Sequence, residues 1–239
     1  MKEIKTENKI QNNENQLNLP SINQDLVFKN VHFSYFDSNK KILNNLNLKI
    51  KSGSVVGIFG KSGTGKTTIF DLLIKLYQPT HGEIFFNNIN INKYGTANWR
   101  EKISYVTQEP ILFTGTLREN ILLDRKYSDQ QILDACLIAN LNDFLINKEG
   151  LDTKIEDNGI NLSGGQKRRI AIARSLISDP FLVIIDEATN SLDELSEQTI
   201  IKKLKLLKKL TVILVSHRNV TKNSVDESYE LINGEVFKL

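Results

Sequence analysis

Apolar side chains recur along this chain with two periods, which divide it into strands and helices. Apolar and polar residues alternate over 25–36 and 41–50, as they do in half-exposed strands. Short apolar runs predict further strands at 54–60, 82–88, 102–108, 181–186 and 211–217. Apolar residues at helical spacing predict helices over 66–77 and 194–210. The segment 228–239 is typical of a hairpin that turns at Asn233–Gly234.

A block with helical spacing interrupts this alternation between Ile111 and about residue 180. We therefore expect an α/β core with an antiparallel β subdomain towards its N-terminus and an α-helical subdomain inserted at about 111–180. Residues 1–24 are polar and Asn/Gln-rich, without the apolar segment of a signal peptide. We expect them to form a flexible lead-in or linker, so that the domain spans 25–239.

Composition and charge exclude some classes of protein. The net charge of the 239 residues is only +3, which argues against a dedicated nucleic-acid binder. The lysines of 202–209 fall opposite the apolar residues of the same helix, and we interpret them as a solvated face. Apolar runs are too short to span a membrane, which predicts a soluble chain. The single cysteine, Cys136, occupies an apolar helical position and is expected to pack in the core.

A glycine-rich loop between a predicted strand and a predicted helix indicates phosphate binding. The segment "GKSGTGKTT" matches the G-x-x-x-x-G-K-[ST] pattern in full, in the context that this pattern requires. Backbone N–H groups and the helix N-terminus would surround the phosphates, Lys66 would reach the β- and γ-oxygens, and the Thr67 hydroxyl would bind Mg²⁺. We expect a P-loop NTPase core in which the nucleotide contacts Gly60, Ser62, Gly63, Thr64, Gly65, Lys66, Thr67 and Thr68.

Polar side chains follow three of the predicted buried strands. Asp186 ends "FLVIID" and is expected to hold Mg²⁺, while the adjacent Glu187 is the candidate general base or water-orienting group. His217 follows "TVILVS", and a lone histidine at this position is more often structural; its place at the same sheet edge favours a catalytic role. Gln108 ends "ISYVTQ", and its amide could both coordinate Mg²⁺ and contact the attacking water.

A second glycine-rich helix start, "LSGGQ" at 162–166, is not explained by the first phosphate site. Ser163 occupies an N-cap position, and Gly164 and Gly165 leave the first turn without side chains. Free N–H groups, a hydroxyl and the positive end of the helix dipole could therefore receive an anion from outside. The alternative is a local capping box between Ser163 and Gln166. The residues are compatible with both arrangements, so the helix start could be self-capped at one time and bound to an anion at another.

With these motifs in this order, the chain resembles the nucleotide-binding domain of ABC transporter ATPases over roughly residues 25–239. The resemblance implies an ATP- and Mg²⁺-dependent ATPase in which Tyr35 stacks on adenine. It also implies that two domains pair head-to-tail, as a homodimer or with another ABC domain. Residues Ser163, Gly164, Gly165 and Gln166 then contact the ATP of the partner, and Asp193 in "NSLD" communicates across the dimer.

The segment "LFTGTLRENI" after Gln108 is similar to exporter-type ABC domains, in which it faces the membrane domains. This implies transmembrane partners, fused or separate, and a location at the cytoplasmic face of the membrane. Similarity to bacterial peptide and bacteriocin exporters is looser, so the substrate class stays open between peptide, lipid and drug. A soluble ABC ATPase acting on nucleic acid or ribosomes is the alternative, disfavoured by the single cassette and the low charge. A binding module without hydrolysis would require loss of Glu187 or His217, and both are present.

Overall fold

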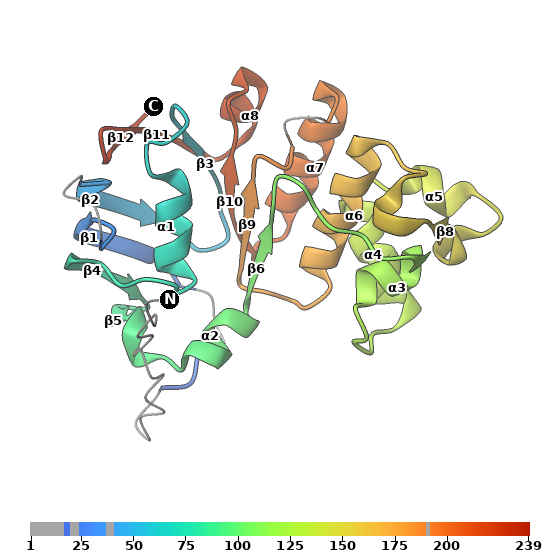
Figure 1. Cartoon of the computed structure of the whole chain (residues 1–239), viewed down its shortest axis with the longest axis horizontal. Coiled ribbons are helices and arrows are strands. Elements are labelled where there is room, and N and C mark those ends of the chain that lie inside the picture. Colours follow the sequence, from blue (N-terminus) through green and yellow to red (C-terminus); the bar gives the residue numbers. More distant parts are fainter. Residues whose placement is uncertain (1–16, 20–23, 37–40, 190–191) are drawn as a thin grey trace, which may run out of the picture.

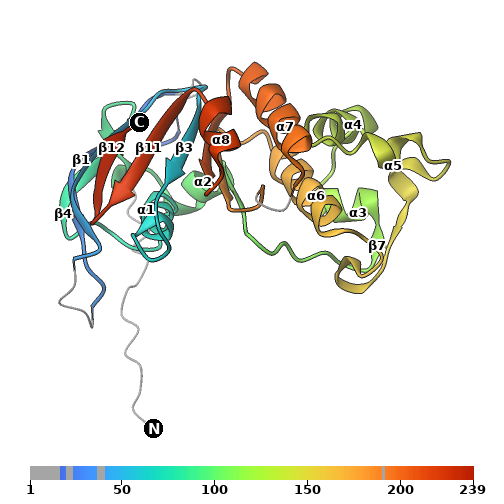
Figure 2. The ribbon, with the colours of Figure 1, turned by 90° about the horizontal axis from the view of Figure 1, so that it is seen from above.

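The computed structural model describes residues 17–19, 24–36, 41–189 and 192–239. Figure 1 shows a body that contains two sheets, with a helical part beside it. The helices α6 (Gly164–Leu176) and α7 (Glu194–Leu206) lie between the two parts. The view from above in Figure 2 shows the same division, with α3, α4 and α5 at the end of the molecule away from the sheets.

The central sheet contains the strands that end at the candidate site. Its order is β12-β11-β3-β10-β9-β6. All neighbouring strands are parallel except for the pair of β11 and β12. Because parallel strands end at the same edge, the residues that follow β3, β6, β9 and β10 are brought together. The bounds of these strands are Val55–Phe59 for β3, Ile103–Val106 for β6, Leu182–Asp186 for β9, Thr211–Val215 for β10, Glu227–Ile232 for β11 and Glu235–Lys238 for β12.

Both faces of the central sheet are covered, which explains its continuous apolar strands. Leu182 and Ile184 of β9 pack into a core shared with helix α1 (Lys66–Leu73) and the second sheet. Val183 and Ile185 face the opposite core, which includes residues of α3, α4, α6 and α7. The prediction of a buried strand at 181–186 is confirmed, because successive residues of β9 pack alternately into the two cores.

The second sheet is antiparallel, as predicted for the N-terminal part, and has the order β2-β1-β4-β5. Helix α2 (Thr96–Glu101) follows it and leads into β6. Together with the mixed central sheet and the helical part, this arrangement confirms the predicted α/β fold class. The bounds of the four strands are Leu26–Phe33 for β1, Leu43–Ile50 for β2, His81–Phe86 for β4 and Ile89–Asn90 for β5.

The helical part is less uniformly helical than its sequence pattern suggests. It contains α3 (Leu117–Leu122), α4 (Asp129–Ile138) and α5 (Asn142–Ile146) before α6. It also contains a small antiparallel sheet, in which β7 (Gly115–Thr116) pairs with β8 (Lys154–Ile155). This pairing joins segments almost forty residues apart, which local periodicity does not reveal. Cys136 is fully buried in the core beneath α6, as predicted.

Helix α1 ends at Leu73, four residues before the predicted end at residue 77. Lys75 adopts a positive φ of 57°, which turns the chain out of the helix. Side chains of α2 then satisfy the last carbonyl groups of α1. The Trp99 indole donates to the Leu73 carbonyl at 2.6 Å, and Arg100 donates to the carbonyl groups of Ile74 and Lys75. Tertiary donors therefore replace the helical turn that the sequence pattern predicts.

The predicted hairpin is confirmed at Asn233–Gly234, between β11 and β12. Both turn residues have positive φ, at 52° and 82°, as a type I′ turn requires. Helix α8 (Asn219–Ser224) precedes this hairpin. Of the predicted lead-in, residues 1–16 and 20–23 lie outside the described part, and Leu17 forms a bridge to Tyr94. Within the described part of the chain, no helix has the length and apolar character needed to span a bilayer.

Candidate nucleotide site

The glycine-rich loop runs from the end of β3 to the first residue of α1, as its sequence predicts. Gly60 has a φ of 144°, and a Cβ at this position would lie 2.6 Å from the Leu231 carbonyl oxygen, so a side chain has no room there. The ammonium group of Lys66 donates to the carbonyl groups of Gly60 and Lys61 at 2.7 and 2.9 Å. Burial lowers the pKa of Lys66, and the charges of Glu187 and Asp186 oppose this shift. The lysine is thus held inside the curve of its own loop.

Glu187 stands at the centre of a hydrogen-bonded group at the carboxyl edge of the sheet. Its Oε1 lies 2.9 Å from Nε2 of His217, and its Oε2 accepts from Nε2 of Gln108 at 3.3 Å. Its backbone has a φ of 53°, and its N–H donates to the Val215 carbonyl of the neighbouring strand. The three residues that the sequence places at the ends of β9, β10 and β6 therefore meet around one carboxylate.

Asp186, at the end of β9, has a partner that the sequence analysis does not identify. The hydroxyl of Tyr105 on β6 donates to Asp186 Oδ2 at 2.6 Å. Burial first, then this hydrogen bond and the charge of Asp186, raise the pKa of Tyr105, so its hydroxyl stays protonated and remains a donor. No signal in the sequence distinguishes Tyr105 from an ordinary strand residue, since tyrosine is common in strands.

A cavity of about 250 Å³ joins the loop to the carboxylates. Four residues predicted for this site, Gly60, Thr64, Gln108 and His217, are not among its lining residues. Gln108 and His217 instead bond to Glu187, which lines the cavity. The lining residues are Tyr35, Ile42, Ser62, Gly63, Gly65, Lys66, Thr67, Thr68, Asp186 and Glu187.

Tyr35 lines this cavity, where the resemblance places the adenine. Its hydroxyl lies 3.1 Å from Thr68 Oγ1 and donates to Asp71 Oδ2 at 3.5 Å, while its ring packs edge-on against Phe33 and Tyr77. Burial raises the pKa of Asp71, with the charge of Asp186 adding to the shift and the hydrogen bond from Tyr35 opposing it. The position of the tyrosine ring is therefore fixed from the side of α1.

The lining residues fit a Mg²⁺-bound polyphosphate. Mg²⁺ prefers hard oxygen ligands and takes one or two from the protein when phosphates supply others. The hydroxyl of Thr67 and the carboxylate of Asp186 are such ligands and face the same cavity. Lys66 and the N-terminus of α1 provide positive charge beside them. When bound there, the metal would neutralise charge on the phosphate oxygens.

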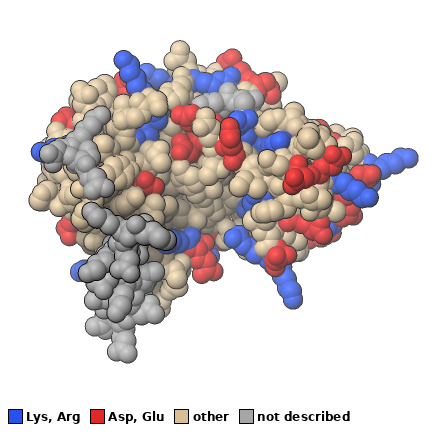
Figure 3. Space-filling model, in the orientation of Figure 1, with Lys and Arg blue, Asp and Glu red and all other residues tan. Residues whose placement is uncertain are grey.

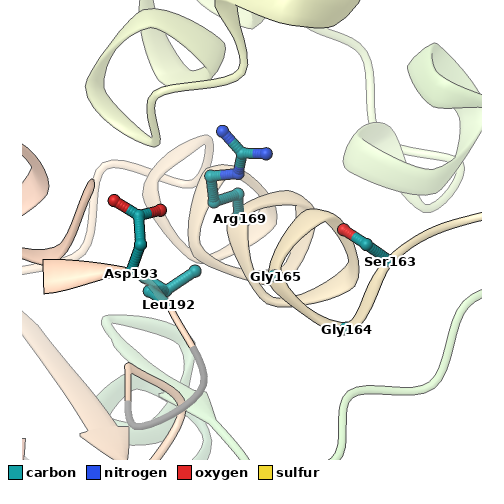
Figure 4. Close-up of a pocket in the computed structure, with 6 residues that line it drawn as sticks. All are labelled: Ser163, Gly164, Gly165, Arg169, Leu192 and Asp193. Carbon is teal, nitrogen blue, oxygen red and sulfur yellow. The ribbon is translucent and has the colours of Figure 1, made fainter. Parts of the chain in front are cut away.

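The second glycine-rich helix start forms a separate pocket of about 410 Å³, shown in Figure 4. Ser163 Oγ accepts from the Gln166 N–H at 3.2 Å, and Gln166 Oε1 accepts from the Ser163 N–H at 2.9 Å. The capping box foreseen as one of two alternatives is therefore present. Gln166 and Arg169 also donate to the same oxygen of Asp143 on α5. Among the residues that the structure describes, this pocket shares none with the cavity at the P-loop. Its lining consists of Ser163, Gly164, Gly165, Arg169, Leu192 and Asp193.

Asp193 caps helix α7, where its Oδ1 accepts from the Ser196 N–H at 2.8 Å. Hydrogen bonds from the side chain and then the backbone N–H of Ser196 lower the pKa of Asp193, and the positive charge of Arg169 contributes in the same direction. Figure 4 shows the Asp193 carboxylate and the Arg169 side chain on the same side of the pocket, with Ser163 at the start of α6. The structure thus places the start of α6 beside the Asp193 loop of the same chain.

Comparison with known proteins gives the family. The ABC transporter family model matches residues 43–190. The leukotoxin translocation ATP-binding protein LktB of Mannheimia glucosida is 39% identical over 92% of this chain and 32% of its own length. A putative export ATP-binding/permease protein of Rickettsia typhi is 39% identical over 95% of this chain and 40% of its own length. The chain therefore spans between a third and two fifths of the length of these relatives.

A solved structure agrees with these matches. A bacterial Atm1-family ABC exporter with ATP bound is 32% identical, has a TM-score of 0.83, and matches 94% of this chain and 40% of its own. Its fold covers the two sheets and the helical part described above. The chain therefore belongs to the ABC transporter family.

Proposed function

We propose that this domain hydrolyses Mg²⁺–ATP between two paired copies and thereby drives export through transmembrane domains. The observation that carries the proposal is the convergence of His217 and Gln108 on Glu187, at the cavity that also contains Lys66. This group contains a carboxylate that can accept a proton, held in place by two other strands, beside a phosphate-binding loop.

Each residue of the site has a defined task in this proposal. Lys66 and the backbone of the loop bind the β- and γ-phosphates, and Tyr35 contacts the adenine. Thr67 and Asp186 hold Mg²⁺, and Gln108 adds an amide oxygen to the metal and a contact to water. Glu187 orients the attacking water and accepts its proton, and His217 fixes the Glu187 carboxylate through the 2.9 Å contact. Dipoles fixed before the reaction are the most effective source of transition-state stabilisation.

The need for two copies rests on the separation of the two pockets. Within the described part of the chain, the pocket at Ser163, Gly164, Gly165 and Gln166 has no lining residue in common with the cavity at the P-loop. We propose that these four residues bind the γ-phosphate held by the partner, with Asp193 contacting the partner beside them. In this proposal the capping box forms when the domain is unpaired. The backbone N–H groups of Ser163 and Gln166 become available to the phosphate when the two hydrogen bonds between these residues break.

The contact with membrane domains is assigned to the segment that follows Gln108. Ile111 and Phe113 lie two residues apart on this segment and are 67% and 55% exposed. Arg174 of α6 donates to the carbonyl of Ile111, and Asn120 bonds both backbone groups of Phe113. The exposed residues are therefore rigidly presented rather than loosely attached, as a docking surface for another domain requires.

Organisation beyond this domain follows from the relatives and from the resemblance. We propose that residues 25–239 form the ATPase domain, that residues 1–24 connect it to other parts, and that the helical subdomain spans about 111–180. The membrane domains would be fused or separate, and the domain would act at the cytoplasmic face of the membrane. Figure 3 shows basic and acidic side chains interspersed on the face in view, which offers no extended basic surface for nucleic acid there.

The first experiment tests hydrolysis. The purified chain should hydrolyse ATP with Mg²⁺, and Glu187→Gln should lower kcat by about 10² or more while ATP binding persists. Glu187→Gln should also form a stable dimer with ATP, detected by size-exclusion chromatography with light scattering. Turnover of Glu187→Gln at the wild-type rate would contradict the assignment of the general base. Activity that depends on added RNA would favour the nucleic-acid alternative.

The second experiment tests the sharing of residues between copies. Lys66→Ala damages the P-loop, and Ser163→Arg blocks the start of α6, so each variant alone should be inactive. In a mixed dimer, one composite site carries both changes and the other carries neither. Mixing the two variants should therefore restore up to about a quarter of wild-type activity for random pairing of equal amounts, as expected for independent sites. No recovery in mixtures that form mixed dimers would contradict the shared site.

A further inference from the structure

Tyr105 has no predicted role at the site, yet from β6 it contacts the carboxylate that is predicted to bind the metal. β6 runs parallel to β9, with Tyr105 opposite Ile184, so the tyrosine side chain reaches along the sheet towards Asp186. The hydroxyl lies 2.6 Å from Asp186 Oδ2. The ring packs edge-on against Phe70 of α1, with 6.1 Å between centroids. Two separate contacts, one polar and one apolar, therefore fix this side chain.

The hydrogen bond distinguishes the two oxygens of the carboxylate. Oδ2 of Asp186 accepts the hydrogen bond from the tyrosine hydroxyl, which leaves Oδ1 available to a metal ion or its water. A carboxylate on a short side chain rotates about its terminal bond unless a partner fixes it. Residues that orient the ligands of a metal in this way affect its affinity almost as strongly as the ligands themselves.

The same strand also contacts the second carboxylate of the site. Gln108, two residues beyond the end of β6, donates to Glu187 Oε2 at 3.3 Å. The segment from Tyr105 to Gln108 therefore donates to both adjacent carboxylates. It leads directly into the exposed segment around Ile111. A shift of β6 would change the geometry of both acidic groups at once.

We propose that Tyr105 is a positioning residue for Mg²⁺–nucleotide binding, acting through its hydrogen bond to Asp186. This inference rests on the proposed function, because it assigns Asp186 to the metal. Tyr105 is not among the residues that line the cavity, so it acts without contacting the nucleotide. Removing its hydroxyl should therefore weaken the binding of ATP in the presence of Mg²⁺. The binding of ATP without Mg²⁺, which depends on the phosphate loop, should not change.

Tyr105→Phe removes the hydroxyl and keeps the ring that packs on Phe70, so it separates the two contacts. ATP affinity is measured by isothermal titration calorimetry in the Glu187→Gln background, once with Mg²⁺ and once with EDTA. Tyr105→Phe should weaken Mg²⁺–ATP binding about tenfold, as loss of a second-layer partner does. Its affinity for ATP in EDTA should equal that of the parent. The matched control is Tyr127→Phe, because Tyr127 packs against the core of the helical part.

A double-variant cycle then tests whether the effect passes through Asp186. In the Asp186→Ala background, which lacks the acceptor, the added Tyr105→Phe change should have no further effect on the Mg²⁺-dependent affinity. A full tenfold loss in that background would overturn the proposal, as would an unchanged Mg²⁺-dependent affinity in Tyr105→Phe alone. If the parent protein itself binds ATP equally with Mg²⁺ and with EDTA, the metal assignment fails instead. The two failures are therefore distinguishable.

In the wild-type background, the Mg²⁺ concentration that gives half-maximal ATPase rate provides a second readout. Tyr105→Phe should raise it about tenfold and recover most of the wild-type kcat at saturating Mg²⁺. A role in packing alone predicts no change in this concentration, since the ring contact with Phe70 is kept. A lowered kcat with unchanged Mg²⁺ dependence would contradict the positioning role.

Discussion

Arg218 donates to the fully buried carboxylate of Glu197 at 2.7 Å, and the same nitrogen donates to the Leu192 carbonyl at 2.8 Å. Arg218 directly follows His217, and Leu192 directly precedes Asp193. One ion pair with a buried carboxylate therefore joins the loop that carries the histidine beside Glu187 to α7 and to the Asp193 loop that precedes α7. The hydroxyl of Thr221 also donates to Glu197, so this carboxylate has partners at both oxygens.

Replacing Arg218 by methionine should destabilise the protein strongly. The Glu197 carboxylate would remain buried without its cation, which costs about 3 kcal/mol in the free energy of unfolding. The measurement is urea unfolding followed by far-UV circular dichroism. The control is Lys49→Met, because Lys49 pairs with Asp25 at side chains that are 60% and 37% exposed. Such a surface pair should contribute less than about 1 kcal/mol.

A double variant separates stability from activity. Arg218→Met combined with Glu197→Met removes both charges and should recover much of the lost stability. The ATPase rate of both the single and the double variant should be below that of the wild type, because the Leu192 carbonyl loses its hydrogen bond from Arg218 in each. Recovery of both stability and activity would show that the pair serves folding alone.

Replacing His217 by alanine should lower kcat about 10²-fold or more with little change in ATP affinity, because Glu187 would lose the partner 2.9 Å away that fixes its carboxylate. Steady-state ATPase assays give kcat, and calorimetry gives the affinity. His81→Ala is the control, since His81 lies on the antiparallel sheet and pairs edge-on with His32. A loss of affinity without loss of kcat would assign His217 to binding rather than to hydrolysis.

The contribution of Lys75 to the stability of the protein should rise with pH above about 8. Burial, with a smaller effect of the nearby Arg100 charge, lowers the pKa of Lys75 from 10.5 to about 8. Between these values the unfolded chain binds a proton that the folded chain does not bind, so the free energy of unfolding increases with pH. The gain attributable to Lys75 is on the order of 2 kcal/mol from about pH 8 to 9.5.

Urea unfolding across this pH range tests the effect through the difference between wild type and Lys75→Met, which should lack this contribution. Lys209→Met, at an exposed position, should retain it. A difference that does not vary with pH would show that the ammonium group of Lys75 is solvated in the folded protein.

The thiol of Cys136 should be unreactive in the folded protein. The side chain is fully buried, and burial raises its pKa to about 12, so almost no thiolate is present at neutral pH. Because the chain contains one cysteine, the reaction with an aromatic disulfide reagent reports this residue alone. The reaction at pH 8 should require unfolding and should be complete in urea. Rapid stoichiometric reaction without urea would mean that the helical part opens readily.

Several parts of the candidate site could be predicted because each depends on a local pattern. The loop at 60–65 requires glycines at fixed positions, and the candidate catalytic side chains follow apolar strands that end at one edge. The sequence therefore predicts that Glu187, Gln108 and His217 lie together, and the structure brings their side chains into contact. Tyr105 is not predicted, because its contact with Asp186 depends on the distance between the side chains of two strands. The early end of α1 also depends on another element, since Trp99 and Arg100 supply the donors.

The sequence by itself determined the family, the two-sided burial of the central strands and the types of residue at the phosphate loop, because these follow from spacing and periodicity along the chain. Only the tertiary structure decided which oxygen of each carboxylate has a partner, which of two states the Ser163 helix start adopts and how the Arg218 loop is joined to the Asp193 loop. These features depend on hydrogen bonds between residues that are distant in sequence. A hydrogen bond requires a donor–acceptor distance within a range of a few tenths of an ångström, and a pattern of apolar and polar positions does not specify distances so precisely.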